Sequence, residues 1–425
     1  MNFRSKGTKE IVFLTVCVMG LLAILSSTMS KTPVLPYFAG YLNTPGFWEG
    51  FVYSASTIPG ILISLPAGSL SDVLGRRKML LISSLIFASA PFLYLLVNLW
   101  WQLALVRFYH GFATAMFVPV AEALVTEAYP TRRGERISLF SSATVIGRSI
   151  APLLGSTILV VTNPGLLPEQ YSNFHGLYLA VGVVGVTVFI TSLPFLGKNK
   201  TVADVKKSTK VDLGKLIRGW KDIAKTHGVL AVSLVEAGQY YTYASIESFF
   251  IKYMTYVAFI DGFSQGVIMF SLVIVVVLSK PLIGRLSDKT GRRTPIVLGC
   301  IVSSIPVIAV PFFTQFSALL ILAMAYGLGF SIVTSATTAL VSELVPLEAC
   351  GGAMGFISTL MDVGQTLGPI ICGVILSTFL GYLGIFFSLM IVLLSTAAAF
   401  ALFGIGRSDS EPKVCQTGNE KKVLS

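Results

Sequence analysis

Five of the ionisable side chains inside the long apolar stretches of this 425-residue chain are the main candidates for chemistry. Asp362, Glu236 and Glu122 are carboxylates, and Arg107 and Arg148 are cations. Charged groups are costly in an apolar environment, and those that occur there usually face a polar cavity or one another. Burial favours the neutral, proton-carrying form of a carboxylate, whereas Arg keeps its charge. The pattern therefore predicts a site that binds protons, ions or charged solutes.

Depth within each stretch separates these candidates. Asp362 and Arg148 each fall near the middle of a stretch, since each helical residue advances about 1.5 Å. We expect Asp362 to bind a proton or a cation, with a static ion pair to Arg148 as the alternative. Glu236 is expected to line a cavity. Glu122 either does the same or packs against the inner end of its stretch.

The stretch "QYYTYASIESFF" at 239–250 supplies a second kind of surface. Tyr240 and Tyr241 have apolar faces and polar tips, which suit a cavity for amphipathic or cationic compounds. The alternative is an aromatic belt at the membrane interface. Lys31 and Glu247 lie near the outer ends of their stretches, where we expect long side chains to snorkel to the interface.

The apolar stretches themselves predict an all-α membrane protein. The chain is 54% hydrophobic and 12% charged, against about 25% charged residues in soluble domains. Runs of about twenty apolar residues match the thickness of a bilayer core. Twelve transmembrane helices are expected, at 10–36, 46–70, 79–98, 101–126, 137–161, 176–197, 229–254, 263–283, 295–314, 316–341, 351–376 and 381–404.

The distribution of Lys and Arg predicts the orientation. With both termini in the cytoplasm, 26 of the 31 Lys and Arg residues fall in cytoplasmic segments. This bias follows the positive-inside rule and predicts a multi-pass protein of the cell membrane. It accounts for the net charge of +11 without a nucleic-acid partner, and anionic lipid would be attracted to the basic face.

The chain repeats itself. "GSLSDVLGRRKML" at 68–80 returns as "GRLSDKTGRRTPI" at 284–296, and "ALVTEAYP" at 123–130 returns as "ALVSELVP" at 339–346, both 216 positions later. "GRSIAPLLG" at 147–155 matches "GQTLGPIICG" at 364–373. The repeat predicts two pseudo-symmetric six-helix halves, 1–197 and 229–404, related by an axis along the membrane normal.

The remaining segments connect or follow these halves. The segment 198–228 is expected to be a cytoplasmic linker, and its residues 213–224 present an apolar helical face suited to the inner leaflet. A plain solvated linker is the alternative. Residues 405–425 form a cytoplasmic tail. The five cysteines have no CxxC spacing and the three histidines are scattered, so we expect no metal site.

The duplicated motif and its setting resemble the major facilitator superfamily. Within it, Arg107-Phe108-Tyr109-His110-Gly111 is similar to the R-x-x-Q-G motif of the drug/proton antiporter branch, with His110 in place of Gln. "GRSIAPLLGS" is similar to that branch's G-x-x-x-G-P-x-x-G-G motif, with Ala151 and Ser156 replacing glycines. The resemblance implies the major facilitator fold and a transporter that rocks two halves about a central site. It also implies that Arg107 binds substrate anions or modulates a carboxylate, and that Arg148 has a functional role.

The duplicated motif implies a conformational latch at the inner face. Asp72 and Asp288 could accept hydrogen bonds from helix N-termini, and the Arg pairs could hold Glu127 and Glu343. In the family a similar network stabilises the outward-facing state; the alternative is that Arg76, Arg77 and Lys78 only set topology. The expected latch residues are Gly68, Asp72, Gly75, Arg76, Arg77, Glu127, Gly284, Asp288, Gly291, Arg292, Arg293 and Glu343. The expected helix-packing residues are Gly147, Pro152, Gly155, Gly364, Gly368 and Pro369.

These features predict a secondary active transporter and not an enzyme. We expect proton-coupled efflux of small apolar or amphipathic compounds by alternating access. An importer of the same fold and a non-transporting membrane sensor are the alternatives. No ATP-binding motif is found in the sequence, so an ion gradient would supply the energy, and no cofactor is expected. The expected partners are a small-molecule substrate and membrane lipid, with no obligatory protein partner and a monomeric state.

The duplicated Asp generates a first test. Asp72→Asn should insert normally but transport slowly or not at all, because the amide cannot supply the negative charge that the latch requires. Transport by the variant, normalised to its amount in the membrane, checks this. A well-inserted variant with normal transport would remove Asp72 from the mechanism.

Overall fold

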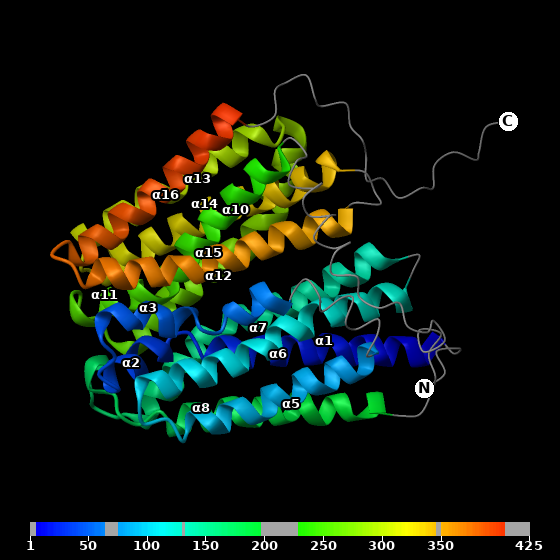
Figure 1. The fold of residues 1–425 in the computed structure, drawn as a ribbon, viewed down its shortest axis with the longest axis horizontal. Coiled ribbons are helices and arrows are strands. Elements are labelled where there is room, and N and C mark those ends of the chain that lie inside the picture. Colours follow the sequence, from blue (N-terminus) through cyan, green and yellow to red (C-terminus); the bar gives the residue numbers. More distant parts are fainter. Residues whose placement is uncertain (1–5, 64–74, 130–131, 197–227, 346–349, 404–425) are drawn as a thin grey trace.

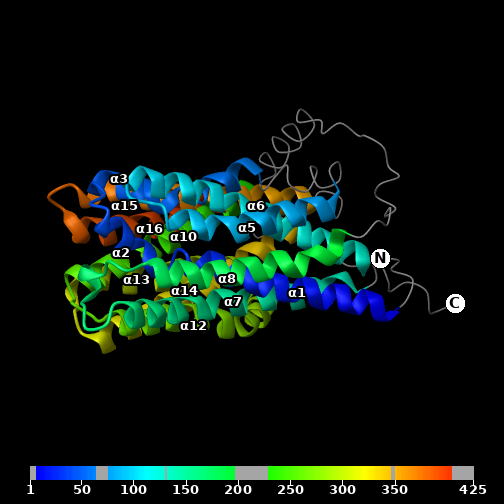
Figure 2. The ribbon, with the colours of Figure 1, turned by 90° about the horizontal axis from the view of Figure 1, so that it is seen from below.

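A computed structural model describes residues 6–63, 75–129, 132–196, 228–345 and 350–403, and these residues contain helices and connecting turns but no strand. The long helices run along one common axis and form two bundles that lie side by side (Figures 1 and 2). The first bundle contains α1 to α8 and the second α10 to α16. The all-helical membrane architecture predicted from the sequence is confirmed.

The first bundle contains seven α-helices with described bounds, of which most of α1 and all of α2 form one membrane span. They are α1 (Lys6–Met29), α2 (Val34–Tyr41), α3 (Gly46–Ser54), α5 (Arg76–Tyr94), α6 (Trp100–Ala128), α7 (Arg133–Thr162) and α8 (His175–Ser192). Two 3₁₀ turns, η1 (Pro168–Gln170) and η2 (Leu193–Leu196), flank α8.

The second bundle follows the same plan. It consists of α10 (Val229–Ser245), the π-helical turn η4 (Ile246–Phe250), α11 (Ile251–Tyr256), α12 (Gly262–Thr290), α13 (Arg293–Ala309), the 3₁₀ turn η5 (Val310–Phe312), α14 (Phe316–Leu344), α15 (Cys350–Leu376) and α16 (Gly381–Phe403).

Ten spans in the described residues are helical, long enough and apolar enough to cross a membrane. The expected second and seventh spans are not among these ten: part of the second, residues 64–70, lies outside the described residues, and both contain a break in the α-helix. In the second, α3 ends at Ser54, turns occupy 55–57 and helix resumes at 58–63. Pro59 has no amide hydrogen to donate at this restart. In the seventh, the π turn η4 separates α10 from α11.

The repeated glycines let helix backbones touch within each bundle. A Cβ on Gly147 would lie 2.3 Å from the Leu21 carbonyl oxygen, and one on Gly364 would lie 2.1 Å from the Ala237 carbonyl oxygen. No side chain fits at such distances, so α7 packs on α1, and α15 on α10, through bare backbone. Leu21 and Ala237 are 216 positions apart, so the two contacts are equivalent in the repeat.

The prolines of the same motifs lie where one bundle meets the other. A Cβ on Gly50 in α3 would lie 1.9 Å from the Pro369 carbonyl oxygen, and one on Gly266 in α12 would lie 3.1 Å from the Pro152 carbonyl oxygen. Gly155 and Gly368 pack within their own bundles, against Pro33 and the Tyr241 carbonyl respectively. The motif therefore serves contacts both within and between the bundles.

The two ends of the molecule differ in how their cores are organised. We call the end with Arg76 and Arg292 the basic end, and the other, at the left of Figure 1 with α2 and α11, the opposite end. At the opposite end one apolar core includes residues of both bundles, such as Phe38 and Phe249. Two further cores are confined to one bundle each and include Met79 and Ile296, which lie near the basic end. The bundles are therefore joined chiefly at the opposite end.

The close glycine contact predicts a change in stability. Gly364→Ala should lower the free energy of unfolding by about 1–3 kcal/mol, because the new methyl group collides with backbone that cannot move aside. Gly284→Ala in α12 is the matched control, because a Cβ there meets nothing within 4 Å and Ala favours a helix by up to about 1 kcal/mol. Unfolding midpoints of both variants in detergent measure the difference. Equal midpoints would contradict the packing role of Gly364.

Candidate functional site

Two Arg–Glu pairs occupy repeat-related positions at the basic end. Arg76 Nε lies 2.6 Å from Glu127 Oε1, and Arg292 Nη2 lies 2.8 Å from Glu343 Oε1. Each pair joins residues 51 positions apart. The expected pairing of the first arginine of each motif with Glu127 or Glu343 is therefore present within each bundle.

The rest of the duplicated motif is partly helical. In the second bundle, α12 continues through Gly284 and Asp288 to Thr290, and Gly291, at φ +83°, ends it. Gly75 has an equivalent φ of +90°, a conformation that favours glycine. The Asp288 carboxylate lies 2.6 Å from Arg292 Nη2, so its neighbour is a side chain rather than the helix N-terminus that we expected.

The other members of the motif behave differently. Arg293 donates a hydrogen bond to the Ala401 carbonyl of α16, and Arg77 lies in the first turn of α5. Gly68 and Asp72 lie outside the described residues.

Partial burial opposes the charge of Arg292, but hydrogen bonds and the negative charges of Glu343 and Asp288 raise its pKa overall. Arg292 therefore keeps its positive charge at neutral pH.

Two Lys–Glu pairs connect the bundles at the opposite end. Lys31 Nζ binds Glu247 Oε2, and Lys252 Nζ binds both carboxylate oxygens of Glu49. Glu49 is 4% exposed and Glu247 8%. Buried pairs of this kind are strongly destabilised when one partner is lost, because the other charge remains in an apolar environment. We call these two pairs the opposite-end clamp.

The clamp follows the internal symmetry of the chain. Lys31 and Glu247 are 216 positions apart, so one repeat position faces its own counterpart across the bundle interface. Glu49 corresponds in the same way to Gln265. Gln265 Oε1 accepts a hydrogen bond of 2.6 Å from the Tyr37 hydroxyl, so this counterpart of Glu49 also contacts the other bundle. The expectation that Lys31 and Glu247 snorkel to the membrane surface is wrong, because they bind each other.

Arg107 is a buried structural cation in α6. It is 1% exposed, and it donates hydrogen bonds to the Val52 carbonyl (2.9 Å), the Tyr53 carbonyl (3.1 Å) and the Ser56 hydroxyl. These acceptors lie where α3 ends, so Arg107 satisfies carbonyls that the helix break frees. The neighbouring His110 is also buried, with its Nδ1 3.4 Å from the Ser30 and Tyr94 hydroxyls.

Arg148 and Lys280 are accessible cations within the spans. They lie on α7 and α12, which pack together, and both side chains are exposed. Arg148 is within electrostatic range of Lys280 and of the Tyr240 and Tyr243 hydroxyls of α10. No ion pair of Arg148 is found in the described part of the chain. These side chains form a polar surface between the bundles.

The tyrosines of α10 belong to an aromatic cluster inside the protein. The Tyr240 and Tyr243 rings lie 5.4 and 5.0 Å from the ring of Phe330 in α14. Tyr243 is buried and Tyr240 half-buried, while Tyr241 is buried against α15. This arrangement places the three tyrosines inside the protein and does not fit a lipid-facing aromatic belt.

Asp362 lies at mid-depth between the bundles. A Cβ on Gly60, in the helical segment after α3, would lie 2.7 Å from Asp362 Oδ2. One turn further along α15, the Thr366 hydroxyl binds the Thr57 hydroxyl at 2.7 Å, and the Thr366 carbonyl accepts a hydrogen bond from Ser54. The carboxylate is half-buried and touches the other bundle.

The two remaining carboxylates differ in burial and partners. Glu236 of α10 is 1% exposed and accepts a hydrogen bond from the Thr337 hydroxyl of α14. Glu122 of α6 is half-buried, and within the described residues it has no ion-pair partner. The structure therefore brings Glu236, Tyr240, Arg148 and Asp362 toward one region and leaves Arg107 and Glu122 in separate environments of α6.

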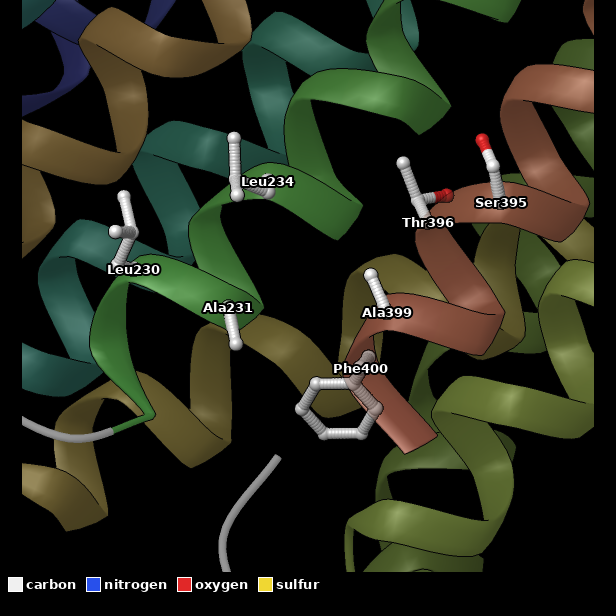
Figure 3. Close-up of a pocket in the computed structure, with 7 residues that line it drawn as sticks. All are labelled: Leu230, Ala231, Leu234, Ser395, Thr396, Ala399 and Phe400. Carbon is white, nitrogen blue, oxygen red and sulfur yellow. The ribbon is translucent and has the colours of Figure 1, made fainter. Parts of the chain in front are cut away.

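An apolar groove lies apart from these polar residues. It encloses about 430 Å³ between α10 and α16 (Figure 3), and it is lined by Leu230, Ala231, Leu234, Ser395, Thr396, Ala399 and Phe400. The Ser395 and Thr396 hydroxyls both bond to the Val392 carbonyl of their own helix. The groove offers apolar contact but no spare polar group for recognition.

A family model settles the membership. The model described as "Major Facilitator Superfamily" matches residues 16–274 and 248–423. The chain belongs to the Major Facilitator Superfamily. Members of this superfamily are transporters, so the expected classification as a transporter rather than an enzyme is confirmed.

Relatives and solved structures agree with this membership. The chain is 25% identical to an uncharacterised MFS-type transporter of Methanocaldococcus jannaschii, with 80% of this chain and 85% of the relative covered. It is 24% identical to the multi-drug resistance efflux pump PmrA homolog of Lactococcus lactis, with 83% and 85% covered. The second of these relatives supports the resemblance to the drug/proton antiporter branch.

The fold matches solved superfamily structures. A bacterial homolog of the human lysosomal transporter Spinster, in an inward-facing and occupied conformation, matches with a TM-score of 0.75, 15% identity and coverage of 94% of this chain and 97% of that one. The xylose transporter XylE from E. coli, in an inward open conformation, matches with a TM-score of 0.71, 14% identity and coverage of 95% and 98%. The predicted major facilitator fold is confirmed.

The clamp of this superfamily member generates a charge-exchange test. Lys31→Glu or Glu247→Lys alone should separate the bundles at the opposite end, because loss of a buried pair costs about 3–5 kcal/mol. The double exchange should restore the pair. Spin labels at the exposed positions Tyr41 and Phe379, in a background without native cysteines, would report a longer distance in each single variant and the original distance in the double variant.

A surface pair provides the control for this cycle. Arg132 and Glu135 form an ion pair with both side chains exposed, and such pairs contribute about 0–1 kcal/mol. Exchanging them should leave the label distance unchanged. Single clamp variants with the original distance would show that the Lys31–Glu247 pair does not hold the bundles together.

Proposed function

We propose that this transporter exports small apolar or amphipathic compounds in exchange for protons. The relationship to a multi-drug efflux pump, at 24% identity, supports efflux as the activity. The aromatic cluster of Tyr240, Tyr243 and Phe330 supports a substrate with apolar surface, since such rings accept varied apolar bodies through their faces. Import of a solute is the second candidate, since the same fold is found in a xylose transporter.

The observation that carries the proposal is the unequal contact at the two ends. The bundles share one core and the opposite-end clamp at one end, and they have separate cores near the basic end. A rocking motion about the mid-depth contact would open the clamp and close the basic end. We infer that the state described here is open at the basic end, which the distribution of Lys and Arg assigns to the cytoplasm.

Asp362 is suited to couple this motion to proton movement. Its carboxylate lies against Gly60 of the other bundle. Of the cross-bundle contacts of α15 described above, this one lies furthest from the opposite end. When the bundles separate at that level, the carboxylate gains water and the charged form is favoured; when they close, desolvation favours the neutral form. Opening alternately to each side would then load and release a proton.

The remaining features of the proposal follow from the same scheme. The energy comes from an ion gradient rather than a cofactor, and the protein acts as a monomer in the cell membrane with both termini in the cytoplasm. The Arg–Glu pairs of the basic end lie within each bundle in the present state. Neither of these two pairs joins one bundle to the other, which agrees with a transporter open at that end.

The coupling role of Asp362 predicts a separation of two activities. Asp362→Asn should keep equilibrium exchange of substrate but lose uphill movement driven by a pH gradient, because an amide cannot change its protonation. Proton flux and substrate flux, measured together in proteoliposomes across a panel of amphipathic compounds, check this. Asp261→Asn is the control, because Asp261 caps α12 through the Ser264 amide and Asn caps helices equally well.

The outcomes distinguish the alternatives. Uphill transport by Asp362→Asn with the wild-type proton ratio would assign coupling to another carboxylate. Substrate accumulation in the direction of an inward proton gradient, rather than against it, would favour the importer.

A further inference from the structure

A second buried carboxylate lies inside the second bundle, away from the bundle contact of Asp362. Glu236 of α10 is 1% exposed, and the Thr337 side chain of α14 is fully buried beside it. The corresponding positions of the first half, 216 residues earlier, are Gly20 and Ala121. The polar pair is therefore an addition to one half of an otherwise repeated scaffold, and packing of that scaffold does not need it.

The Thr337 hydroxyl has one proton and two oxygen neighbours. It lies within hydrogen-bond distance of Glu236 Oε2 and 3.0 Å from the Val333 carbonyl oxygen. A hydroxyl donates one hydrogen bond and accepts others. It can therefore donate to Glu236 or to Val333, but not fully to both.

Two hydrogen-bond arrangements follow. If Glu236 is ionised, Thr337 donates to the carboxylate and leaves Val333. If Glu236 carries a proton, the carboxyl group donates to the Thr337 oxygen, and Thr337 donates to the Val333 carbonyl. In this second arrangement, both hydroxyl hydrogens have an acceptor at the positions that the structure already shows. No unpaired negative charge remains in the core.

The surroundings supply a partner for the ionised form as well. Lys280 of α12 lies within electrostatic range of Glu236 and would stabilise the negative charge. The Cys300 thiol of α13 also lies within range of Glu236, and it accepts a hydrogen bond from Gln239 Nε2 at 3.4 Å. Arg148 acts on Lys280 from α7 of the other bundle, and Tyr240 lies within range of both Glu236 and Asp362.

These contacts make the site sensitive to the position of the bundles. Arg148 belongs to the first bundle, whereas Glu236, Thr337 and Lys280 belong to the second. If Arg148 moves relative to Lys280, the repulsion between these two cations changes. The stabilisation that Lys280 gives to ionised Glu236 changes with it. The protonation of Glu236 is thereby linked to rocking without any direct contact between Glu236 and the first bundle.

We propose that Glu236 and Thr337 form a proton-binding site in which the Thr337 hydroxyl reverses its hydrogen bond as Glu236 gains or loses a proton. This inference rests on the proposed proton-coupled transport and adds a second proton group to it. The proton stays on the Glu236 carboxyl in one state and leaves to water in the other. No other reactant is needed.

Isotope-edited infrared spectroscopy of the purified full chain tests the site without any transport assay. Over a pH titration, the wild-type protein should show a band of a protonated carboxyl group that is absent from Glu236→Gln and still present in Asp362→Asn. Thr337→Val should shift the frequency of this band, because the carboxyl loses its hydroxyl acceptor. Thr337→Ser, which keeps the hydroxyl, should restore it. A spectrum unchanged by Glu236→Gln at every pH would overturn the proposal.

Transport by the same variants tests the link to coupling. Glu236→Gln places an amide donor beside Thr337 and so imitates the protonated arrangement; it should fold, exchange substrate and lose part of the proton flux. Wild-type proton flux in Glu236→Gln would overturn the coupling role. If no compound is transported by the wild-type chain, the proposed function fails, while the infrared result still decides whether Glu236 binds a proton.

Discussion

The cost of an unpaired charge away from water governs the arrangement of this transporter. At the opposite end, two glutamates that are almost wholly buried each bind a lysine of the other bundle. Such a pair is stable when closed, and its members are stable again when both reach water, but intermediate separations are unfavourable. Two pairs that connect the same bundles therefore favour a switch between discrete states over gradual opening. The shared apolar core beside them adds to this preference.

Close backbone contact sets the limits within which the bundles move. Glycines allow α7 to lie on α1, and α15 on α10, at distances that exclude any side chain. Each bundle is thus locked internally, and motion is left to the interface between bundles. At that interface, Gly50 and Gly266 meet the carbonyls of Pro369 and Pro152 in two equivalent crossings. The repeat therefore produces two equivalent backbone contacts between the bundles.

The two halves differ at the residues on which the proposed coupling rests. Asp362 and Glu236 have no carboxylate at the matching positions of the first half, and Arg148 matches Gln365 in the second. Packing that both halves share does not account for these departures, which agrees with the proposed roles of the two carboxylates. Asp362 touches the moving interface, whereas Glu236 lies within one bundle beside Lys280. The two carboxylates would thus respond to rocking by different physical routes: one through hydration, and the other through the placement of cations.

The sequence by itself determined the membrane class, the approximate positions of the helices and the repeat, because apolar length and a fixed offset are local properties of the chain. It also indicated that the duplicated Arg pairs could hold Glu127 and Glu343, since all of these residues recur at one offset, but the structure decided that Arg76 and Arg292 form the pairs. Only the tertiary structure decided the break after α3, the capture of its carbonyls by Arg107 and the pairing of Lys31 with Glu247. Those contacts join residues whose facing depends on how two separate bundles approach each other. A pattern read along one chain specifies which face of a helix is polar, but the partner of a buried charge is set by desolvation across the whole interface.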